Sequence, residues 1–250
     1  SQSIIKEFTE CTRVNVDLCD ISSIRFVQFW IGGPVSEDFI RKIELQWHCN
    51  VFVIPQNVID ACANPNVSKV AVFDLDSTLI QMEVIDTLAA WKPEIGDQVA
   101  RITEDSMAGR IDFQESLKRR VSLLKGIPIE EAWKKIKETV EFTPGAVEVF
   151  QNFFNEQNGW TTAVLSGGFL PIAQWVKERL KLSEAHANML QVDSDGLLTG
   201  QLQPGHAILD SKAKESHLIR LVGQVNSAVS VAVGDGANDL LMLGVATLGI

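Results

Sequence analysis

Tyrosine is absent from this sequence of 250 residues, and cysteine is scarce. Tyrosine is therefore excluded from every catalytic role, and six Trp and twelve Phe residues carry the aromatic packing. The four cysteines all lie in the first quarter of the chain, at Cys11, Cys19, Cys49 and Cys62, and no CxxC pair occurs. A secreted disulfide scaffold would be denser in cysteine, and a zinc site needs a different ligand spacing. We therefore expect reduced, partly buried thiols.

The chain also has fewer basic than acidic residues. It contains 22 Lys and Arg and 32 Asp and Glu, which gives a net charge of −10. An acidic surface disfavours nucleic acid and anionic membranes as partners. No apolar run approaches the roughly 20 residues of a membrane span, and the first residues lack the basic and then apolar order of a signal peptide. With 46% apolar and 22% charged residues, the composition is typical of a globular protein. We expect a soluble, cytoplasmic protein.

The first part of the chain predicts a small β-α-β module. Residues 24–31 are β-branched and aromatic, Ser36 opens a helix with apolar residues at helical spacing, and residues 51–54 form a second short apolar strand. A linker of Asn, Pro and Asn at 64–66 ends this module, which we place at residues 1–66. About 65 residues make a thin core, so we expect the module to pack on another surface or on a second copy in a homodimer.

The rest of the chain, residues 67–250, predicts a doubly wound α/β sheet, because buried apolar runs alternate with helical patterns. The strands are expected at 70–73, 161–165 and 229–233, and the helices at 144–157, 169–181 and 212–223. Thr143 is expected to cap the first of these helices, with Pro144 at its first position. Two stretches break the alternation: residues 84–140, a predicted helical insertion, and 186–203, a predicted hairpin turning at Asp195-Gly196.

Acidic and hydroxyl side chains follow directly after the three predicted strands. They are Asp74 and Asp76, then Ser166, then Asp235 and Asp239. Each of them alone is most often a turn residue or a helix cap. Because ligands bind at the carboxyl ends of parallel strands, however, the four carboxylates are expected at one edge of the sheet. Such a cluster would repel itself, and carboxylate oxygens are ligands that Mg²⁺ prefers. The joint pattern therefore predicts a Mg²⁺ site.

The same residues predict phosphoryl chemistry. In a D-x-D sequence after a strand, alternate side chains point the same way, so one carboxylate can attack phosphorus while the other handles the leaving-group proton. A cation must neutralise the phosphate oxygens. Lys212 and Lys214, at the start of the helix before the last strand, are both candidates.

Taken in order, DLDST, LSGG, a lysine on a helix and VGDGAND resemble the four motifs of the haloacid dehalogenase superfamily of phosphotransferases. The stretches DLDSTLIQMEVID, MAGRIDFQESLKRRVSLLKG and VAVGDGANDL are similar to its members that hydrolyse phosphoserine, over roughly residues 70–250. The resemblance implies a Rossmann-like core in which the inserted helices form a cap that closes over the substrate. The implied reaction is the Mg²⁺-dependent hydrolysis of O-phospho-L-serine, the last step of serine biosynthesis.

The resemblance assigns the chemistry to the acidic residues. Asp74 is the expected nucleophile that becomes phosphoaspartate, and Asp76 is the acid that protonates the leaving serine and later activates water. The expected Mg²⁺ ligands are Asp74, the backbone carbonyl of Asp76, and Asp235, with Asp239 supporting them from the same loop.

The phosphate is expected to be held by Ser166, Gly167 and Lys214, with Asn238 ordering that end of the site. Lys214 is preferred to Lys212 because it falls at the family's position.

The remaining expected residues recognise the amino acid part of the substrate. Glu83, at the cap hinge, can pair with its ammonium group, and Arg120 can make a bidentate pair with its carboxylate. Met107 and Phe113 are expected to form an apolar wall. Without the resemblance, Arg120 would be interpreted as a surface charge and Phe113 as part of the cap's own core.

Two alternatives stay open. Phosphohomoserine or phosphothreonine would keep the chemistry, since one methyl group is worth only about 1–3 kcal/mol of discrimination. The other alternative is a non-catalytic regulator that senses an amino acid through its N-terminal module. Because members of the resembling family continue beyond the position of Ile250, we also expect a frayed edge at the C-terminal end of the sheet.

Overall fold

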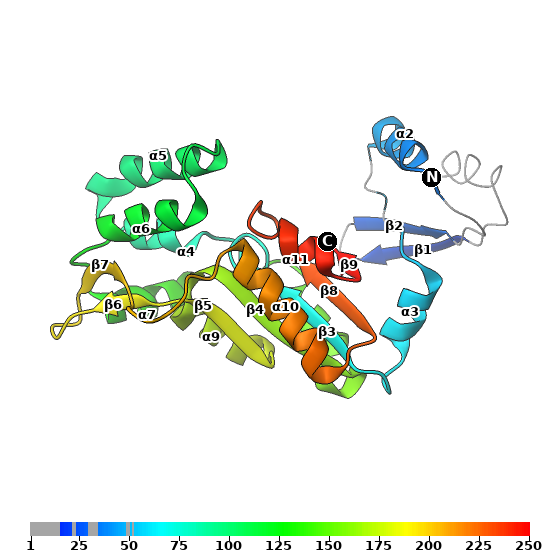
Figure 1. Ribbon diagram of the computed structural model, residues 1–250. Coiled ribbons are helices and arrows are strands. Elements are labelled where there is room, and N and C mark those ends of the chain that lie inside the picture. The colour runs from blue at the N-terminus through cyan, green and yellow to red at the C-terminus, as the bar shows by residue number, and fades with distance from the viewer. Residues whose placement is uncertain (1–15, 22–23, 30–34, 49–50, 52) are drawn as a thin grey trace. The chain divides into compact units, whose positions relative to one another are not determined.

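The computed structural model describes residues 16–21, 24–29, 35–48, 51 and 53–250 (Figure 1). Two compact units divide the chain, Ser1–Pro55 and Gln56–Ile250, and each is described by itself. The division falls ahead of the expected linker at 64–66 because helix α3 (Gln56–Ala63) buries Val58 in the core of the second unit.

The first unit contains a hairpin and a helix. Strand β1 (Val16–Ile21) pairs antiparallel with β2 (Ile24–Phe29), and α2 (Glu37–Trp47) follows. The helix begins as predicted, with the Phe39 amide donating to Ser36 Oγ at 3.2 Å. The strand expected over residues 51–54 is wrong in the part that the structure describes, where residues 51, 53 and 54 are irregular. A short apolar run before a proline does not distinguish a strand from irregular chain.

The second unit is built on a parallel five-stranded sheet of order β5-β4-β3-β8-β9. Its strands are β3 (Lys69–Phe73), β4 (Trp160–Phe169), β5 (Glu184–Asn188), β8 (Val229–Val233) and β9 (Leu248–Gly249). The three predicted strands are its three central strands. Phe73 pairs in register with both Val164 and Val233, so β3 and β8 end at the same edge. Strand β4 continues past this edge to Phe169, with an irregularity in its pairing between Leu165 and Phe169, so Ser166 lies within the strand and not after it as predicted.

Helices cover both faces of this sheet (Figure 1). Alternate residues of β3 point to opposite sides: Ala71 packs with α3, α8 (Ala146–Asn152) and α9 (Leu170–Leu180), whereas Val72 packs with α10 (Ser211–Val225) and α11 (Leu240–Val245). A strand buried on both faces explains its continuous apolar sequence. The expected doubly wound α/β fold is confirmed.

The predicted cap of Thr143 on α8 is wrong. The helix begins at Ala146, after Gly145 with a φ of 88°, and it is followed by a separate 3₁₀ turn at Glu156–Asn158. Thr143 Oγ1 instead donates to the carbonyl of Thr78 at 2.7 Å, and the Thr143 amide donates to Leu79 at 3.0 Å. These bonds fasten the two connections of the helical insertion to each other, and this tertiary contact replaces the local capping role.

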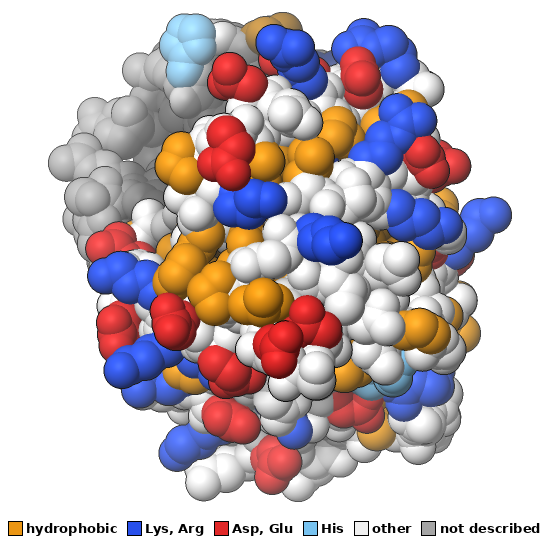
Figure 2. Space-filling model, turned by 90° about the vertical axis from the view of Figure 1, so that its left-hand side faces the viewer, with side chains coloured by type: hydrophobic (Ala, Val, Ile, Leu, Met, Phe, Trp, Pro, Cys, Tyr) orange, Lys and Arg blue, Asp and Glu red, His pale blue; other side chains and the backbone are white. Residues whose placement is uncertain are grey.

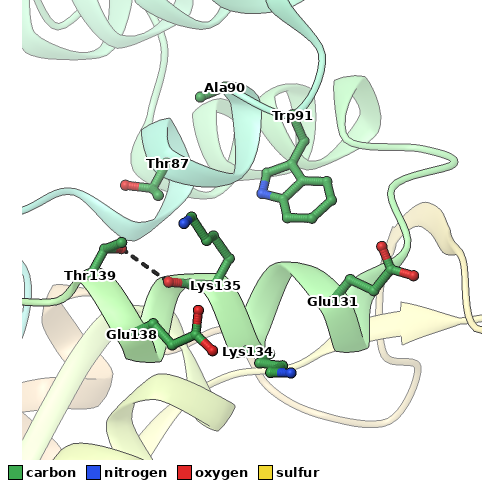
Figure 3. Close-up of a pocket in the computed structure, with 8 residues that line it drawn as sticks. All are labelled: Thr87, Ala90, Trp91, Glu131, Lys134, Lys135, Glu138 and Thr139. Carbon is green, nitrogen blue, oxygen red and sulfur yellow. Dashed lines mark hydrogen bonds between the residues drawn. The ribbon is translucent and has the colours of Figure 1, made fainter.

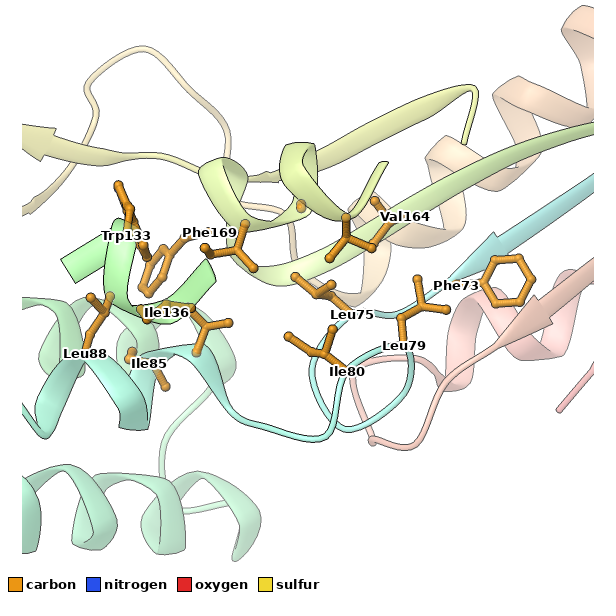
Figure 4. Packing of buried hydrophobic residues seen from close by; sticks show 14 of the residues in the cluster. Phe73, Leu75, Leu79, Ile80, Ile85, Leu88, Trp133, Ile136, Val164 and Phe169 are labelled. Atoms are coloured by element: carbon orange, nitrogen blue, oxygen red, sulfur yellow. The ribbon is translucent and has the colours of Figure 1, made fainter. Parts of the chain in front are cut away.

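The insertion is helical, as predicted. It consists of α4 (Val84–Ala89), a 3₁₀ turn (Pro93–Ile95), α5 (Gly96–Met107), α6 (Phe113–Leu123) and α7 (Ile129–Thr139), and we call it the cap. Its apolar residues are continuous with the core: Trp133 of α7 lies against Phe169 of β4, with ring centroids 6.1 Å apart (Figure 4).

The predicted hairpin is also present, as β6 (Leu190–Val192) and β7 (Leu198–Leu202), with Gly196 in its turn at a φ of 78°. It is fastened to the cap, since the Leu198 amide donates to Ile127 at 3.0 Å and its carbonyl accepts from Gly126 at 2.7 Å.

The C-terminal residues are ordered rather than frayed. Strand β9 pairs with β8, and the Ile250 amide donates to Ala232 at 2.9 Å. Within the described ranges, every helix is too short or too polar to cross a membrane.

Candidate active site

A buried lysine joins carboxylates from two loops at the shared strand edge. Asp74 follows β3, and its amide donates to Val233 of β8 at 2.9 Å. Lys214 of α10 is fully buried, and its ammonium bonds Asp74 Oδ1 and, at 2.6 Å, Asp239 Oδ1. Burial raises the pKa of Asp74 to about 7, against the opposing effect of Lys214. Lys212, the rival candidate, is exposed.

Three of the four predicted carboxylates form a cluster that could hold a metal ion. Asp74, Asp235 and Asp239 each place one carboxylate oxygen within 4.8 Å of the others, and among the described residues they form the only such group. Thr78 Oγ1 donates to Asp235 at 3.1 Å. This all-oxygen set fits a hard divalent cation. Asp239, expected only as support, lies within the cluster, whereas the carboxylate of Asp76 lies outside it.

Asp76 faces residues 166–168, in the last part of β4. Its carboxylate accepts from the Val84 amide at 2.8 Å and from Ser166 Oγ at 3.3 Å. A Cβ on Gly168 would lie 2.7 Å from Asp76 Oδ2, so a larger residue there would displace this carboxylate. Burial raises the pKa of Asp76 to about 7 despite the hydrogen bond from the Val84 amide, and the nearby charge of Glu83 raises it further. The second carboxylate of the D-x-D sequence is therefore in a different environment from Asp74, which is bonded to a lysine.

Residues 166–168 of β4 also meet the cap. Ser166 is buried, and its hydroxyl accepts from the Gly168 amide at 2.8 Å. A Cβ on Gly167 would lie 2.7 Å from the ring of Phe113 and 3.8 Å from Asn238 Nδ2. Phe113 of α6, Gly167 and Asn238 are therefore close neighbours, and the cap is near enough to cover this segment.

The two charged candidates for amino acid recognition lie on the cap side. Glu83 is exposed and accepts from Ser77 Oγ at 2.8 Å, with Ser77 in the left-handed region at a φ of 57°. Arg120 of α6 is half-buried, and its Nε is buried without a hydrogen-bond partner among the described residues. Burial lowers the pKa of Arg120, opposed by the nearby negative charges of Asp86, Glu83 and Asp76.

Arg120 therefore lies close to Asp76 and Glu83 with a donor still available. Met107 is the last residue of α5, and its side chain lies outside the described residues.

Two further residues escaped the sequence analysis. Asn188, at the end of β5, is 3% exposed; its Nδ2 donates to the Gly167 carbonyl and its Oδ1 accepts from the Leu209 amide, both at 2.8 Å. It therefore fixes the last part of β4 to the segment before α10. Ser116, one turn before Arg120, has a buried hydroxyl without a partner in the described part of the chain. The sequence offered one signal for Asn188, because it is a polar residue at the end of a fourth strand.

Charged side chains on one face of the surface are not clustered by sign as the carboxylates of the site are. On the face that Figure 2 shows, acidic and basic side chains are interspersed rather than gathered by sign. An open pocket of about 620 Å³ lies between α4 and α7, lined by residues that include Thr87, Trp91 and Lys135 (Figure 3). None of its lining residues belongs to the predicted site.

Comparison with known proteins identifies the family of this chain. A model of the haloacid dehalogenase-like hydrolases matches residues 68–247. This chain belongs to that family. It is 43% identical to the phosphoserine phosphatase of Saccharomyces cerevisiae, over 99% of this chain and 80% of that protein. It is 44% identical to the probable phosphoserine phosphatase of Schizosaccharomyces pombe, over 81% of this chain and 68% of that protein.

A solved structure of a phospho-aspartyl intermediate analogue of phosphoserine phosphatase is also similar. It superimposes with a TM-score of 0.65 and 39% identity, covering 74% of this chain and 86% of that chain. The family membership expected from the sequence motifs is confirmed.

Proposed function

We propose that this chain hydrolyses O-phospho-L-serine to L-serine and phosphate through an aspartyl phosphate on Asp74. The observation that carries the proposal is the buried group formed by Asp74, Lys214 and Asp239, next to Asp76 and under a cap with Arg120, whose buried Nε has no hydrogen-bond partner among the described residues. The identity of 43–44% with curated phosphoserine phosphatases supports the same substrate. The proposed catalytic domain is the second unit, Gln56–Ile250, which includes α3, and Ser1–Pro55 is the separate module, so the boundary lies earlier than residue 66.

In the first step, a carboxylate oxygen of Asp74 forms a bond to phosphorus, and the bond between phosphorus and the serine oxygen breaks. Asp76, placed beside Ser166 and Gly168, gives its proton to that oxygen. In the second step, Asp76 takes a proton from water, which attacks the phosphorus and releases phosphate, and Asp74 is restored. One residue thus serves as acid and then as base.

The phosphate is held in this proposal by Ser166, Gly167 and Lys214, with Asn238 ordering that end. Lys214 supplies the positive charge, and its two bonds to carboxylates fix its position in advance of the reaction.

The amino acid part of the substrate binds to the cap side. Its ammonium group pairs with Glu83, its carboxylate takes the free donor of Arg120, and Phe113 and Met107 form the apolar wall. Closure of the cap excludes water from the acyl phosphate until the second step.

Mg²⁺ is the proposed cofactor, and the carboxylate cluster fits it. Asp74, Asp235 and the backbone carbonyl of Asp76 would hold the ion, with Asp239 supporting it. When bound, it supplies positive charge that offsets the phosphate oxygens.

The test is phosphate release from phosphoserine by the full chain, with Mg²⁺ and with a chelator. We expect activity only with the metal and a fall to background in Asp74→Asn. Activity that is indifferent to Mg²⁺, or unchanged in Asp74→Asn, contradicts the proposal. Parallel assays of phosphothreonine and phosphohomoserine separate the nearest alternatives, and a failure to hydrolyse any of the three favours the regulator.

We further propose a cytoplasmic location and a homodimer. The free thiol of Cys62 is in keeping with a reducing compartment. Cell fractionation tests the first proposal and size-exclusion chromatography of the full chain tests the second.

A further inference from the structure

Two consecutive residues at the start of α6 contact two different parts of the core. Phe113 lies against Gly167, and the side chain of Gln114 donates from Nε2 to Asp210 Oδ2 at 2.7 Å. Asp210 is the N-cap of α10, where its other oxygen accepts from the Ala213 amide at 3.0 Å. A single carboxylate therefore joins the cap to the beginning of the helix that carries the buried lysine of the site.

We propose that the hydrogen bond between Gln114 and Asp210 is a latch that holds the cap closed over residues 166–168 of β4. Gln114 is then a positioning residue for the proposed hydrolysis of phosphoserine, on which this inference rests. Neither residue touches the reacting atoms.

Three features favour this role. The bond crosses from the cap to the core, and it lies next to the contact of Phe113 with Gly167. It is exposed to solvent, so water can replace either partner when the cap opens. Partial burial raises the pKa of Asp210, but the hydrogen bonds from the Ala213 amide and from Gln114 outweigh this effect and lower it. The acceptor is therefore a carboxylate at neutral pH, and a bond to a charged acceptor is stronger than a neutral one.

Loss of the latch should change the KM for phosphoserine. If only the closed cap binds the substrate well, the apparent affinity falls in proportion to the closed fraction. Loss of one such hydrogen bond changes this equilibrium by about threefold to tenfold. The closed complex itself is unaltered, so we expect KM to rise by up to that factor, and kcat to stay within about twofold.

The decisive variant is Gln114→Glu, which places a carboxylate against the carboxylate of Asp210. Adding Asp210→Asn restores a donor–acceptor pair with its direction reversed, and Asn is as good an N-cap as Asp. Gln98→Glu, on the exposed first turn of α5, makes the same change on the cap away from the core. We expect a raised KM for phosphoserine and faster amide hydrogen exchange of α6 in Gln114→Glu, and wild-type values in the double variant and in Gln98→Glu.

The latch is overturned if Gln114→Glu leaves the exchange of α6 unchanged, or if the double variant shows the same defect as the single one. Hydrogen exchange is measured without substrate, so it decides on the latch independently of activity. A wild-type chain that releases no phosphate from phosphoserine would overturn the proposed function alone.

Discussion

Lys214 and Arg120 are the two cations of the proposed site, and they are held in opposite ways. Lys214, on the core, is fully buried and bonded to two carboxylates. Arg120, on the cap, is half-buried and keeps a buried donor without a partner among the described residues. The core cation therefore holds the protein's own acidic groups in place, whereas the cap cation keeps a donor for which the described residues supply no acceptor. In the proposed function, the core accordingly carries the chemistry and the cap recognises the amino acid part of the substrate.

The largest expected effect comes from removing the core cation. Lys214→Met leaves Asp74 and Asp239 buried without their positive partner, and breaking a buried ion pair costs about 3–5 kcal/mol. Urea unfolding in the presence of a chelator measures this loss, and phosphate release should fall to background. Lys212→Met, at an exposed position on the same helix, is the control. Equal stability of the two variants would contradict the account.

Removing the cap cation should affect recognition and leave stability nearly unchanged. Arg120→Met loses a charged hydrogen bond to the substrate, worth about 1.5–3 kcal/mol, or roughly 10- to 100-fold in kcat/KM for phosphoserine. O-phosphoethanolamine lacks the carboxylate, so its kcat/KM should hardly change. Arg119→Met, at an exposed arginine paired with Glu115, is the control. A similar loss with both substrates would show that Arg120 does not bind the carboxylate.

Asn188 connects residues 166–168 of β4 to the segment before α10, so its replacement should have an intermediate effect. Asn188→Leu leaves the Gly167 carbonyl and the Leu209 amide without partners, at a cost of about 1–3 kcal/mol in the free energy of unfolding. Asn188→Asp keeps the acceptor for Leu209, but it places a buried carboxylate against the Gly167 carbonyl in place of the donor. We expect both variants to unfold at a lower temperature than the wild type. The Asp variant should gain stability relative to the Leu variant as the pH falls, because a protonated carboxyl group can again donate to Gly167. A Leu variant as stable as the wild type would contradict the bridging role of Asn188.

The smallest effect is expected at an ion pair away from the site. Partial burial would raise the pKa of Glu184, but bonds from Arg220 and His186 lower it overall. The stability that Glu184 contributes is therefore fully present above its ordinary pKa and is lost as the pH falls through the lowered value. Glu184→Gln should cost up to about 1 kcal/mol at neutral pH. In urea titrations, the free energies of unfolding of the wild type and of Glu184→Gln should converge as the pH falls. A difference that grows in acid would contradict this prediction.

The sequence predicted the central sheet well because its strands are buried on both faces. The runs around Val72, Ala163 and Val231 have no competing amphipathic pattern, and the position of Asp74 follows from the end of β3. Ser166 lies within β4, because this strand continues through two glycines to Phe169. The role of Thr143 could not be predicted from its neighbours in the sequence, because its hydroxyl donates to the carbonyl of Thr78, which is distant in the chain.

The same limit applies to the connections within the site. Neither the bridge made by Asn188 nor the contact of Gln114 with Asp210 leaves a pattern in the sequence, since each depends on how distant segments pack. Residues that carry chemistry are conspicuous at strand ends, whereas residues that hold segments together are visible only in the folded chain.

The central claim is that Asp74 carries the phosphoryl group. The most direct measurement is to stop the reaction with phosphoserine in acid during turnover and to locate the phosphoryl group by mass spectrometry of peptides. We expect it on Asp74, and we expect it to be absent when Asp74→Asn is treated in the same way. A phosphoryl group on Ser166, or full turnover by Asp74→Asn, would contradict the account.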